Sequence, residues 1–221
     1  MTDINAHLRD SAARMGIQLR PENEPLLLQW LQAILEENTR VNLTALRTPE
    51  AALEGLLADS LAFELHLREH PLPRGAVVAD CGSGGGFPGV VAALLHPEWI
   101  VHLVDSRAKK LKAVERALAQ LPHANLRFDA ERMEALALGA LGRRLDLVLS
   151  RAVGSVAHVL ELCHPCMKPG AVMLLWKSDP LDAEEEAGGR AAAQRFRYEW
   201  LPSIRYTSFK PSQLVRLRRI P

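Results

Sequence analysis

Two aspartates and a glycine-rich segment are the residues in this sequence best suited to bind a ligand. An apolar run at residues 77–79 leads into Asp80 and then into residues 81–89, Cys-Gly-Ser-Gly-Gly-Gly-Phe-Pro-Gly. A second apolar run, residues 100–104, ends at Asp105. Glycines let a backbone turn tightly and approach a ligand, and an acid at the tip of the second strand can accept hydrogen bonds from ribose hydroxyls. The spacing therefore predicts a site for a ribose-bearing cofactor.

Two cofactors fit this segment. Read from Gly84, it matches the G-x-G-x-x-G fingerprint of dinucleotide sites, with Asp105 at the expected distance. Read from Asp80, it matches D-x-G-x-G, the usual first motif of S-adenosylmethionine (SAM) methyltransferases. A carboxylate at Asp80 disfavours a pyrophosphate but favours the ammonium and sulfonium of SAM. We expect SAM, with Asp80, Gly84 and Asp105 in its site. The alternative is a glycine-rich turn without a ligand. In that case the glycines would cost conformational entropy on folding without serving a binding site.

Composition limits the class of protein. A chain of 221 residues with 48% hydrophobic residues suits one domain, or one domain with an appendage. No apolar run approaches the roughly 18 residues of a membrane span, and the N-terminus does not resemble a secretory signal. Three cysteines without such a signal favour the reducing cytoplasm. The C-x-x-C pair Cys163 and Cys166 lacks the second ligand pair that zinc needs, so we expect no metal.

Hydrophobic periodicity divides the chain near residue 70. Residues 1–70 are expected to form a small helical appendage, with helices over 4–15, 25–37 and 48–70. Residues 71–221 alternate between short apolar runs and helical segments, as in a doubly wound α/β domain with a mostly parallel sheet. The acidic residues 179–186 and the glycines that follow are expected to form an exposed, mobile connection. The expected strands are 76–79, 100–104, 125–128, 145–149 and 172–176, with weaker candidates at 198–206 and 214–217; the expected helices between them are 88–95, 108–121, 130–141 and 156–162.

Several short pieces, in order along the chain, resemble the RsmG family of small-subunit rRNA guanine-N7 methyltransferases, also called glucose-inhibited division protein B. The combination of N-L-T, F-P-G and S-R-A-V is much more specific than the glycine motif alone. The matching pieces are Val41-Asn42-Leu43-Thr44-Ala45, Asp59-Ser60-Leu61, the glycine segment, Leu103-Val104-Asp105-Ser106 with Lys109-Lys110, Arg132-Met133-Glu134, Ser150-Arg151-Ala152-Val153 and Lys177.

The resemblance implies the Rossmann-like fold of class I SAM-dependent methyltransferases and a role for individual residues. Gly82 and Phe87 would line the SAM site, and Met133 and Glu134 would lie at the adenine. Arg151 would reach the cofactor or the target base, and we assign it the catalytic role.

The chain departs from the family pattern at three positions. Leu56 stands where the family usually has His, Glu37 where it often has Trp, and Ser178 where it has Gly. The first two concern how the N-terminal helices support the site or meet RNA.

The implied reaction methylates N7 of one guanine in the 530 loop of 16S rRNA, so the implied partner is 16S rRNA or the small ribosomal subunit. Guanine N7 has a free lone pair and needs no general base, which suits a chain without an evident Cys or His nucleophile. We expect the RNA to cross the strand-end face beside Lys109, Lys110 and Arg151. The alternatives are a SAM methyltransferase with another RNA or small-molecule target, and a non-catalytic nucleotide-binding module.

Overall fold

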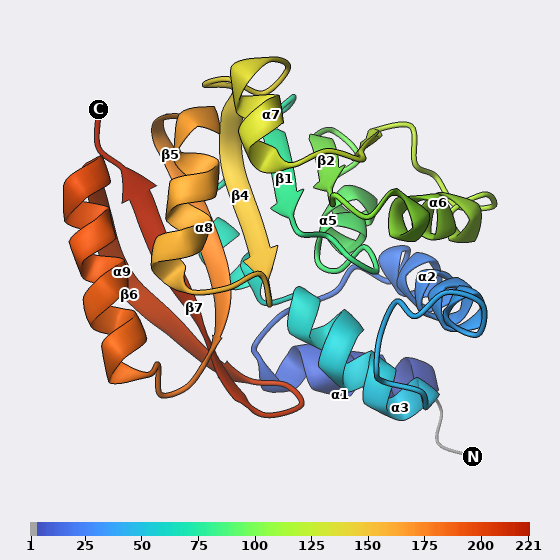
Figure 1. Cartoon of the computed structure of the whole chain (residues 1–221). Coiled ribbons are helices and arrows are strands. Elements are labelled where there is room, and N and C mark those ends of the chain that lie inside the picture. Colours follow the sequence, from blue (N-terminus) through green and yellow to red (C-terminus); the bar gives the residue numbers. More distant parts are fainter. Residues whose placement is uncertain (1–3) are drawn as a thin grey trace.

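A single seven-stranded sheet organises the part of the chain that the structure, a computed structural model, describes, residues 4–221 (Figure 1). Its strands are β1 (Val77–Cys81), β2 (Ile100–Val104), β3 (Leu126–Asp129), β4 (Leu145–Arg151), β5 (Met167–Ser178), β6 (Tyr198–Thr207) and β7 (Pro211–Arg219). The order across the sheet is β3-β2-β1-β4-β5-β7-β6. β1 to β5 are parallel, and β7 runs antiparallel to both β5 and β6. The predicted doubly wound, mostly parallel α/β fold is confirmed, and both weaker strand candidates are strands.

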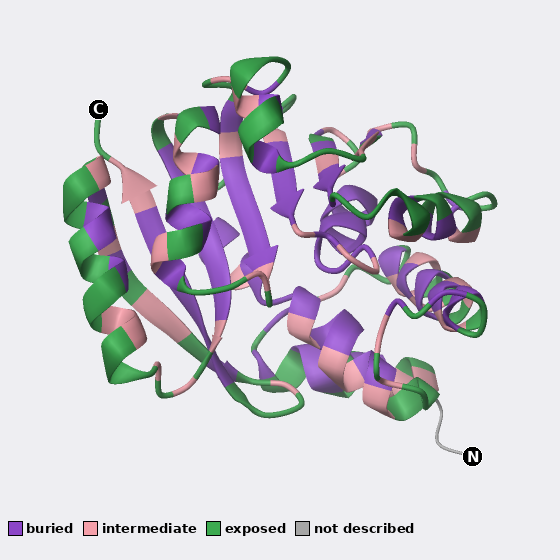
Figure 2. Ribbon diagram, viewed as in Figure 1, coloured by how far each residue is buried: buried purple, intermediate pink, exposed green. Residues whose placement is uncertain are grey.

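Helices cover both faces of the sheet because alternate strand residues face opposite sides. Val78 of β1 and its register partner Leu147 of β4 belong to one hydrophobic core, while Ala79 and its partner Val148 belong to the other. α5 (Gly89–Leu95) and α6 (Ala108–Ala117) pack on the first face. α7 (Met133–Leu138), α8 (Val156–Cys163) and α9 (Ala183–Phe196) pack on the second, and the short turn η2 (His164–Cys166) follows α8. Figure 2 shows the central strands buried between these layers.

The N-terminal helices pack into the core of the first face. They are α1 (Ile4–Arg14), α2 (Asn23–Asn38), α3 (Pro49–Ala52), η1 (Leu53–Ala58) and α4 (Phe63–Leu67). α2 buries Leu27, Trp30 and Ile34 at helical spacing, against α5 and α6. In Figure 1 these helices lie on the side toward which the arrowheads of β1 and β4 point. They therefore adjoin the carboxyl edge of the sheet. The division into residues 1–70 and 71–221 stays a prediction.

The single helix predicted for residues 48–70 is wrong in two respects: residues 53–58 are π-helical, and a turn at residues 61–62 separates them from α4, which ends at Leu67. The side chain of Thr48 caps its start, as expected. η1 is a π-helical turn, in which the amide of Asp59 reaches back to the carbonyl of Glu54. Side chains take up neighbouring carbonyls here, since Ser60 Oγ donates to the carbonyl of Leu56 and Arg151 Nη1 to that of Gly55. Such competition distorts a helix, and π-turns are frequent at functional sites.

The connection predicted for residues 179–189 is largely exposed, as expected, but it is wrong as an irregular segment, because a helix begins within it. α9 begins directly after Asp182, whose Oδ1 accepts hydrogen bonds of 3.0 Å from the amides of Glu184 and Glu185. The acidic residues are the first turn of a helix, where the helix dipole favours them. A Cβ at Gly189 would lie 2.9 Å from atoms of both Val156 and Trp200. This glycine is therefore a site of close helix packing rather than a break. None of the helices in residues 4–221 is long and apolar enough to cross a membrane.

Candidate active site

The glycine loop leaves the carboxyl end of β1 and is fixed to the neighbouring strand. The amides of Gly82 and Ser83 both donate to the carbonyl of Val104, at 2.8 and 3.0 Å. Gly82 has a φ of +73°, and a Cβ there would lie 2.3 Å from Val153 Cγ2. Only glycine fits this position, because the segment after β4 packs directly against the loop backbone.

Asp80 lies beneath this loop. Its side chain is fully buried in β1, and Oδ2 accepts a hydrogen bond of 2.8 Å from the amide of Gly89 at the start of α5. Oδ1 has no partner among the described residues. Burial raises the pKa of Asp80 to about 7, although the Gly89 amide and the charge of Arg151 act in the opposite direction. Asp80 thus ties the loop to the helix that follows it, and its direct contact with a cofactor stays a prediction.

Asp105 stands at the tip of β2, as predicted, with its carboxylate directed at the loop. Its Oδ2 accepts a hydrogen bond of 2.9 Å from the amide of Gly84. Arg107 donates to both oxygens, with Nε 2.9 Å from Oδ1 and Nη2 2.8 Å from Oδ2. Burial by itself would raise the pKa of Asp105, but the hydrogen bonds and charge of Arg107 hold it below its usual value. The carboxylate is therefore ionised and positioned at the loop.

Three neighbouring cavities lie along the carboxyl edge of the sheet. The Met133 cavity, of about 280 Å³, is lined by Asp105 and Met133 among others. The loop cavity, of about 220 Å³, lies over residues 82–85 of the glycine loop. The Phe209 cavity, of about 400 Å³, opens between η1 and the turn that joins β6 to β7, where Phe209 lies. The loop cavity shares wall residues with each of the other two, so it is the middle one.

Ala152 is the residue at which these cavities meet, because it lines all three. It follows Arg151 at the end of β4, and its φ is +59°. A side chain other than glycine in this left-handed region carries strain, which folded proteins tolerate most often at functional sites. The three cavities thus form one elongated site around Ala152.

The other predicted residues are placed as follows. Gly82, Gly84 and Phe87 line the loop cavity, and Met133 lines the cavity named after it. Glu134 is exposed on the first turn of α7 and does not line the Met133 cavity. The structure thus brings all but Glu134 and the supporting Asp80 to the walls of this site.

Arg151 lies in the wall between the loop cavity and the Phe209 cavity. Its Nη1 donates to the carbonyl of Gly55 at 2.9 Å and to Asp59 Oδ2 at 3.1 Å. Its side chain is 18% exposed and lines both cavities. Arg151 therefore connects the sheet edge to η1 and faces the space beside the loop.

Sequence reasoning assigned no role to Asp59, which joins four parts of the fold. Besides the ion pair with Arg151, its Oδ1 accepts hydrogen bonds from Tyr206 Oη at 2.8 Å and Ser208 Oγ at 3.0 Å. Its backbone carbonyl accepts a hydrogen bond of 2.9 Å from Trp176 Nε1. The Asp-Ser pair in the N-terminal helices was the available signal, but its partners are about 90 to 150 residues away in sequence.

Comparison with known proteins identifies the family. Residues 23–204 match the model of the GidB family, described as rRNA small subunit methyltransferase G. The chain belongs to the GidB family. A ribosomal RNA small subunit methyltransferase G from Nitrosospira multiformis is 38% identical over 162 residues, 73% of this chain and 71% of the relative. One from Burkholderia pseudomallei is 33% identical over 186 residues, 84% and 78% of the two chains. The predicted family and its cofactor, SAM, are confirmed.

Solved structures with little sequence similarity share the fold. A SAM-dependent O-methyltransferase from Thermotoga maritima superposes with a TM-score of 0.55 at 13% identity, over 85% of this chain and 71% of the other. A 16S rRNA adenine-N1 methyltransferase from Catenulisporales acidiphilia gives 0.53 at 19% identity, over 66% and 85%. The Rossmann-like fold of class I SAM-dependent methyltransferases is confirmed.

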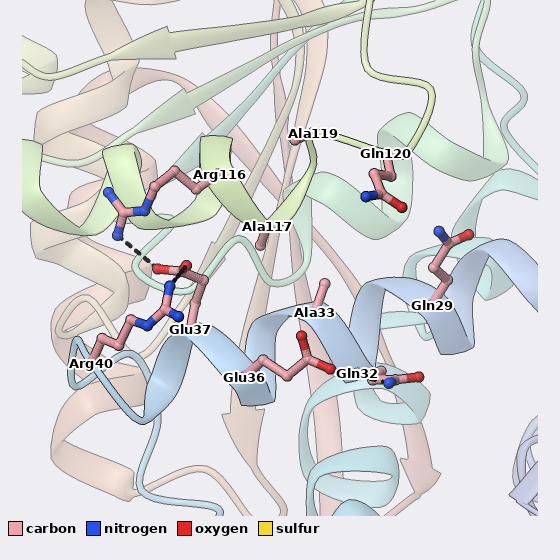
Figure 3. A pocket seen from close by; sticks show the side chains of 10 residues that line it. All are labelled: Gln29, Gln32, Ala33, Glu36, Glu37, Arg40, Arg116, Ala117, Ala119 and Gln120. Carbon is pink, nitrogen blue, oxygen red and sulfur yellow. Dashed lines mark hydrogen bonds and ion pairs between the residues drawn. The ribbon is translucent and has the colours of Figure 1, made fainter.

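The departures from the GidB family pattern have distinct surroundings. Leu56 lines both the loop cavity and the Phe209 cavity, so this departure is in the wall of the site. Glu37 lies away from it, in a surface pocket between α2 and α6 that Figure 3 shows. Arg116 Nη2 lies 2.6 Å from Glu37 Oε2, and Arg40 lies 3.3 Å from Oε1. The hydrogen bond from Arg116 lowers the pKa of Glu37. Glu37 therefore links α2 to α6 through its ion pair with Arg116.

The basic cluster expected to meet RNA lies beside the Asp105 end of the site. Lys109 and Lys110 belong to the first turn of α6, which begins directly after Arg107. Lys109 is exposed, while Lys110 is half-buried. Within residues 4–221, no group of three or more His, Cys, Asp or Glu side chains is arranged to hold a metal ion.

Proposed function

We propose that this chain transfers the methyl group of SAM to N7 of a specific guanine in 16S rRNA, in the cytoplasm, as naked rRNA or within the small ribosomal subunit. The observation that carries the proposal is the set of three cavities meeting at Ala152, with the Asp105 carboxylate at one end. A methyl transfer needs two sites that meet at one point, one for the donor and one for the acceptor.

The donor fits the residues at two of these cavities. The ionised carboxylate of Asp105 suits the ribose hydroxyls, and Met133 offers an apolar, polarisable surface to the adenine. Gly82 lines both the Met133 cavity and the loop cavity. Because it has no side chain, a ligand that spans the two cavities can lie close to its backbone. Arg107 holds both oxygens of Asp105, so its guanidinium has to move aside when ribose hydroxyls take these positions.

The chemistry asks little of the protein beyond alignment. SAM supplies an electrophilic methyl group, so that the N7 lone pair forms the new N–C bond while the electron pair of the broken C–S bond stays on sulfur, with no proton removed. Ala152 and Arg151 exclude water and fix the direction from which the base approaches. Such alignment is the main source of rate acceleration in a reaction of this kind. The base has to be splayed out of its stack to reach Ala152 and Arg151.

The direct test is to incubate the purified protein with labelled SAM and either naked 16S rRNA or small subunits from cells that lack the modification. We expect one label per RNA, mapped to N7 of a single guanine by cleavage at the methylated base. Comparison of the two substrates identifies the assembly state that is used. Label at another atom, or no transfer to either substrate, would overturn the proposal.

A further inference from the structure

We propose that the Phe209 cavity receives the target guanine, with the Phe209 ring as its stacking surface and the Lys210 ammonium as a contact for an adjoining phosphate. The inference rests on the proposed function and deepens it. It gives the turn between β6 and β7 the task of holding the methyl acceptor.

The Phe209 cavity lies next to the space expected for the methyl donor. The acceptor atom must lie about 3–3.5 Å from the methyl carbon before transfer. With the donor in the Met133 and loop cavities, the acceptor has to come from a space that adjoins the loop cavity. The Phe209 cavity does so through a common wall of Leu56, Arg151 and Ala152. Its volume of about 400 Å³ lies in the range of small-molecule sites.

Phe209 presents an exposed aromatic ring at this cavity. Phe209 is 58% exposed, whereas the other large exposed hydrophobic side chains in residues 4–221, Ile100, Leu138 and Ile220, are aliphatic. Every nucleobase has a π-face, and proteins that bind unstacked bases commonly stack them on aromatic side chains. An aromatic ring held at the mouth of a cavity beside a methyl-donor site suits a flipped base.

Glycine at position 55 lets the side chains of Leu46 and Phe209 pack against the backbone of η1 at this cavity. A Cβ at Gly55 would lie 2.6 Å from Leu46 Cδ1 and 3.8 Å from Phe209 Cγ. The backbone of η1 therefore forms part of the wall between Leu46 and the Phe209 ring. Because Ser208 Oγ donates to Asp59 at 3.0 Å, the turn that carries Phe209 is also attached to η1.

Two lysines line the Phe209 cavity, and they differ in whether their charge is already paired. Lys177 also lines this cavity, but its ammonium is already paired with Glu185 at 2.6 Å. Lys210 is exposed beside Phe209 and makes no ion pair with any described residue. Its ammonium is therefore free to bind the backbone of an RNA whose base has entered the cavity.

The test compares Phe209→Ala, Phe209→Leu and Phe209→Trp, with Leu138→Ala as the control for loss of an exposed apolar side chain outside the cavities. Steady-state kinetics with unmodified rRNA, calorimetric SAM affinity and melting temperature are measured for each. We expect Phe209→Ala and Phe209→Leu to lower kcat/KM for rRNA by about tenfold or more, the usual scale of lost base stacking. Phe209→Trp should keep it within about threefold, since the ring is retained. SAM affinity and melting temperature should match those of Leu138→Ala.

Lys210→Ala completes the set. It should raise KM for rRNA and make the slope of log affinity against log salt shallower by about one phosphate contact, with SAM affinity unchanged. Unchanged kinetics in Phe209→Ala, a Phe209→Leu protein as active as the wild type, or a parallel loss of SAM affinity would each overturn the proposal.

A second readout separates this inference from the proposed function. Ligand-observed NMR with guanosine monophosphate, in the presence of S-adenosylhomocysteine, reports on the cavity whether or not the wild type methylates rRNA. Binding by the wild type that is lost in Phe209→Ala supports the assignment. Equal binding by both proteins, or none by the wild type, overturns it even if rRNA is methylated.

Discussion

Arg151 Nη1 lies 3.1 Å from Asp59 Oδ2, and this ion pair joins the end of the fourth strand to the N-terminal helices across the active site. Both side chains are mostly buried, at 18% and 14% exposed. The same Nη1 donates to the carbonyl of Gly55, so one guanidinium holds both the acid and the π-turn. Both contacts use Nη1, so the other nitrogens of the planar guanidinium remain for a ligand in the cavities.

Arg151→Lys tests that geometry. Lysine keeps the charge but carries its three N–H donors on one nitrogen, so it cannot bond to Asp59 and Gly55 and also present a second nitrogen to the cavities. We expect a folded protein with near-normal SAM affinity whose rRNA methyl transfer falls about tenfold or more in single-turnover assays. The control is Arg195→Lys in the distant α9, where the arginine makes an ion pair with Glu161 of α8. Full activity would remove Arg151 from the site, and a large fall in melting temperature would make its role structural.

Asp105→Ala should weaken SAM binding. The carboxylate is ionised and lies at the Met133 cavity, so its loss removes charge-assisted hydrogen bonds worth about 1.5–3 kcal/mol. Calorimetry measures this directly, with the exposed Asp10→Ala as the control. Arg107→Ala frees the carboxylate of its present partner and should leave SAM affinity equal or higher. An Asp105→Ala protein that binds SAM normally would contradict the assignment, and so would tight binding of NAD to the wild type.

Lys109→Glu combined with Lys110→Glu should weaken rRNA binding while leaving SAM affinity near normal. The physical reason is that phosphates neutralised by these lysines release counterions, so rRNA affinity should also become less dependent on salt. The matched control reverses two exposed arginines at the opposite edge of the sheet, Arg74 and Arg144, which precede β1 and β4. Filter binding across a salt series gives both quantities. Equal losses in the two double variants would show only a general charge effect, and joint loss of SAM and rRNA affinity would make the lysines structural.

The stability of the protein should carry a pH dependence from Asp80. Its folded-state pKa is raised to about 7 from an ordinary value of 3.8, so the folded state binds more protons between these two pH values. The contribution of Asp80 to the free energy of unfolding is therefore full below about pH 4 and is lost as the pH rises through about 7, by at most about 1.4 kcal/mol per pH unit. Chemical denaturation from pH 5 to 8 gives the free energy of unfolding of the wild type and of Asp80→Asn. The wild-type value minus the Asp80→Asn value should fall over this range. A difference independent of pH would contradict the raised pKa.

Much of the site could be predicted from local sequence. The strand, glycine loop and Asp105 follow one another within about 30 residues, and each is dictated by nearest neighbours in the chain: apolar runs buried on both faces, glycines at positive φ and an acid at a strand tip. Residues 179–189 show the limit of that reasoning. Their acids and glycines resemble a loop, yet Asp182 caps a helix and Gly189 packs against Trp200, a contact that local composition does not encode.

Periodicity and motifs within short segments were enough to predict the mostly parallel sheet, the cofactor loop and the family. No such segment predicts that Asp59 contacts Arg151, Tyr206 and Ser208, or that Phe209 lines a cavity together with Ala152. These partners are 92 to 149 residues from Asp59 along the chain. Their meeting depends on how the N-terminal helices and the last hairpin pack onto the edge of the sheet, and packing is a property of the whole core rather than of any one segment.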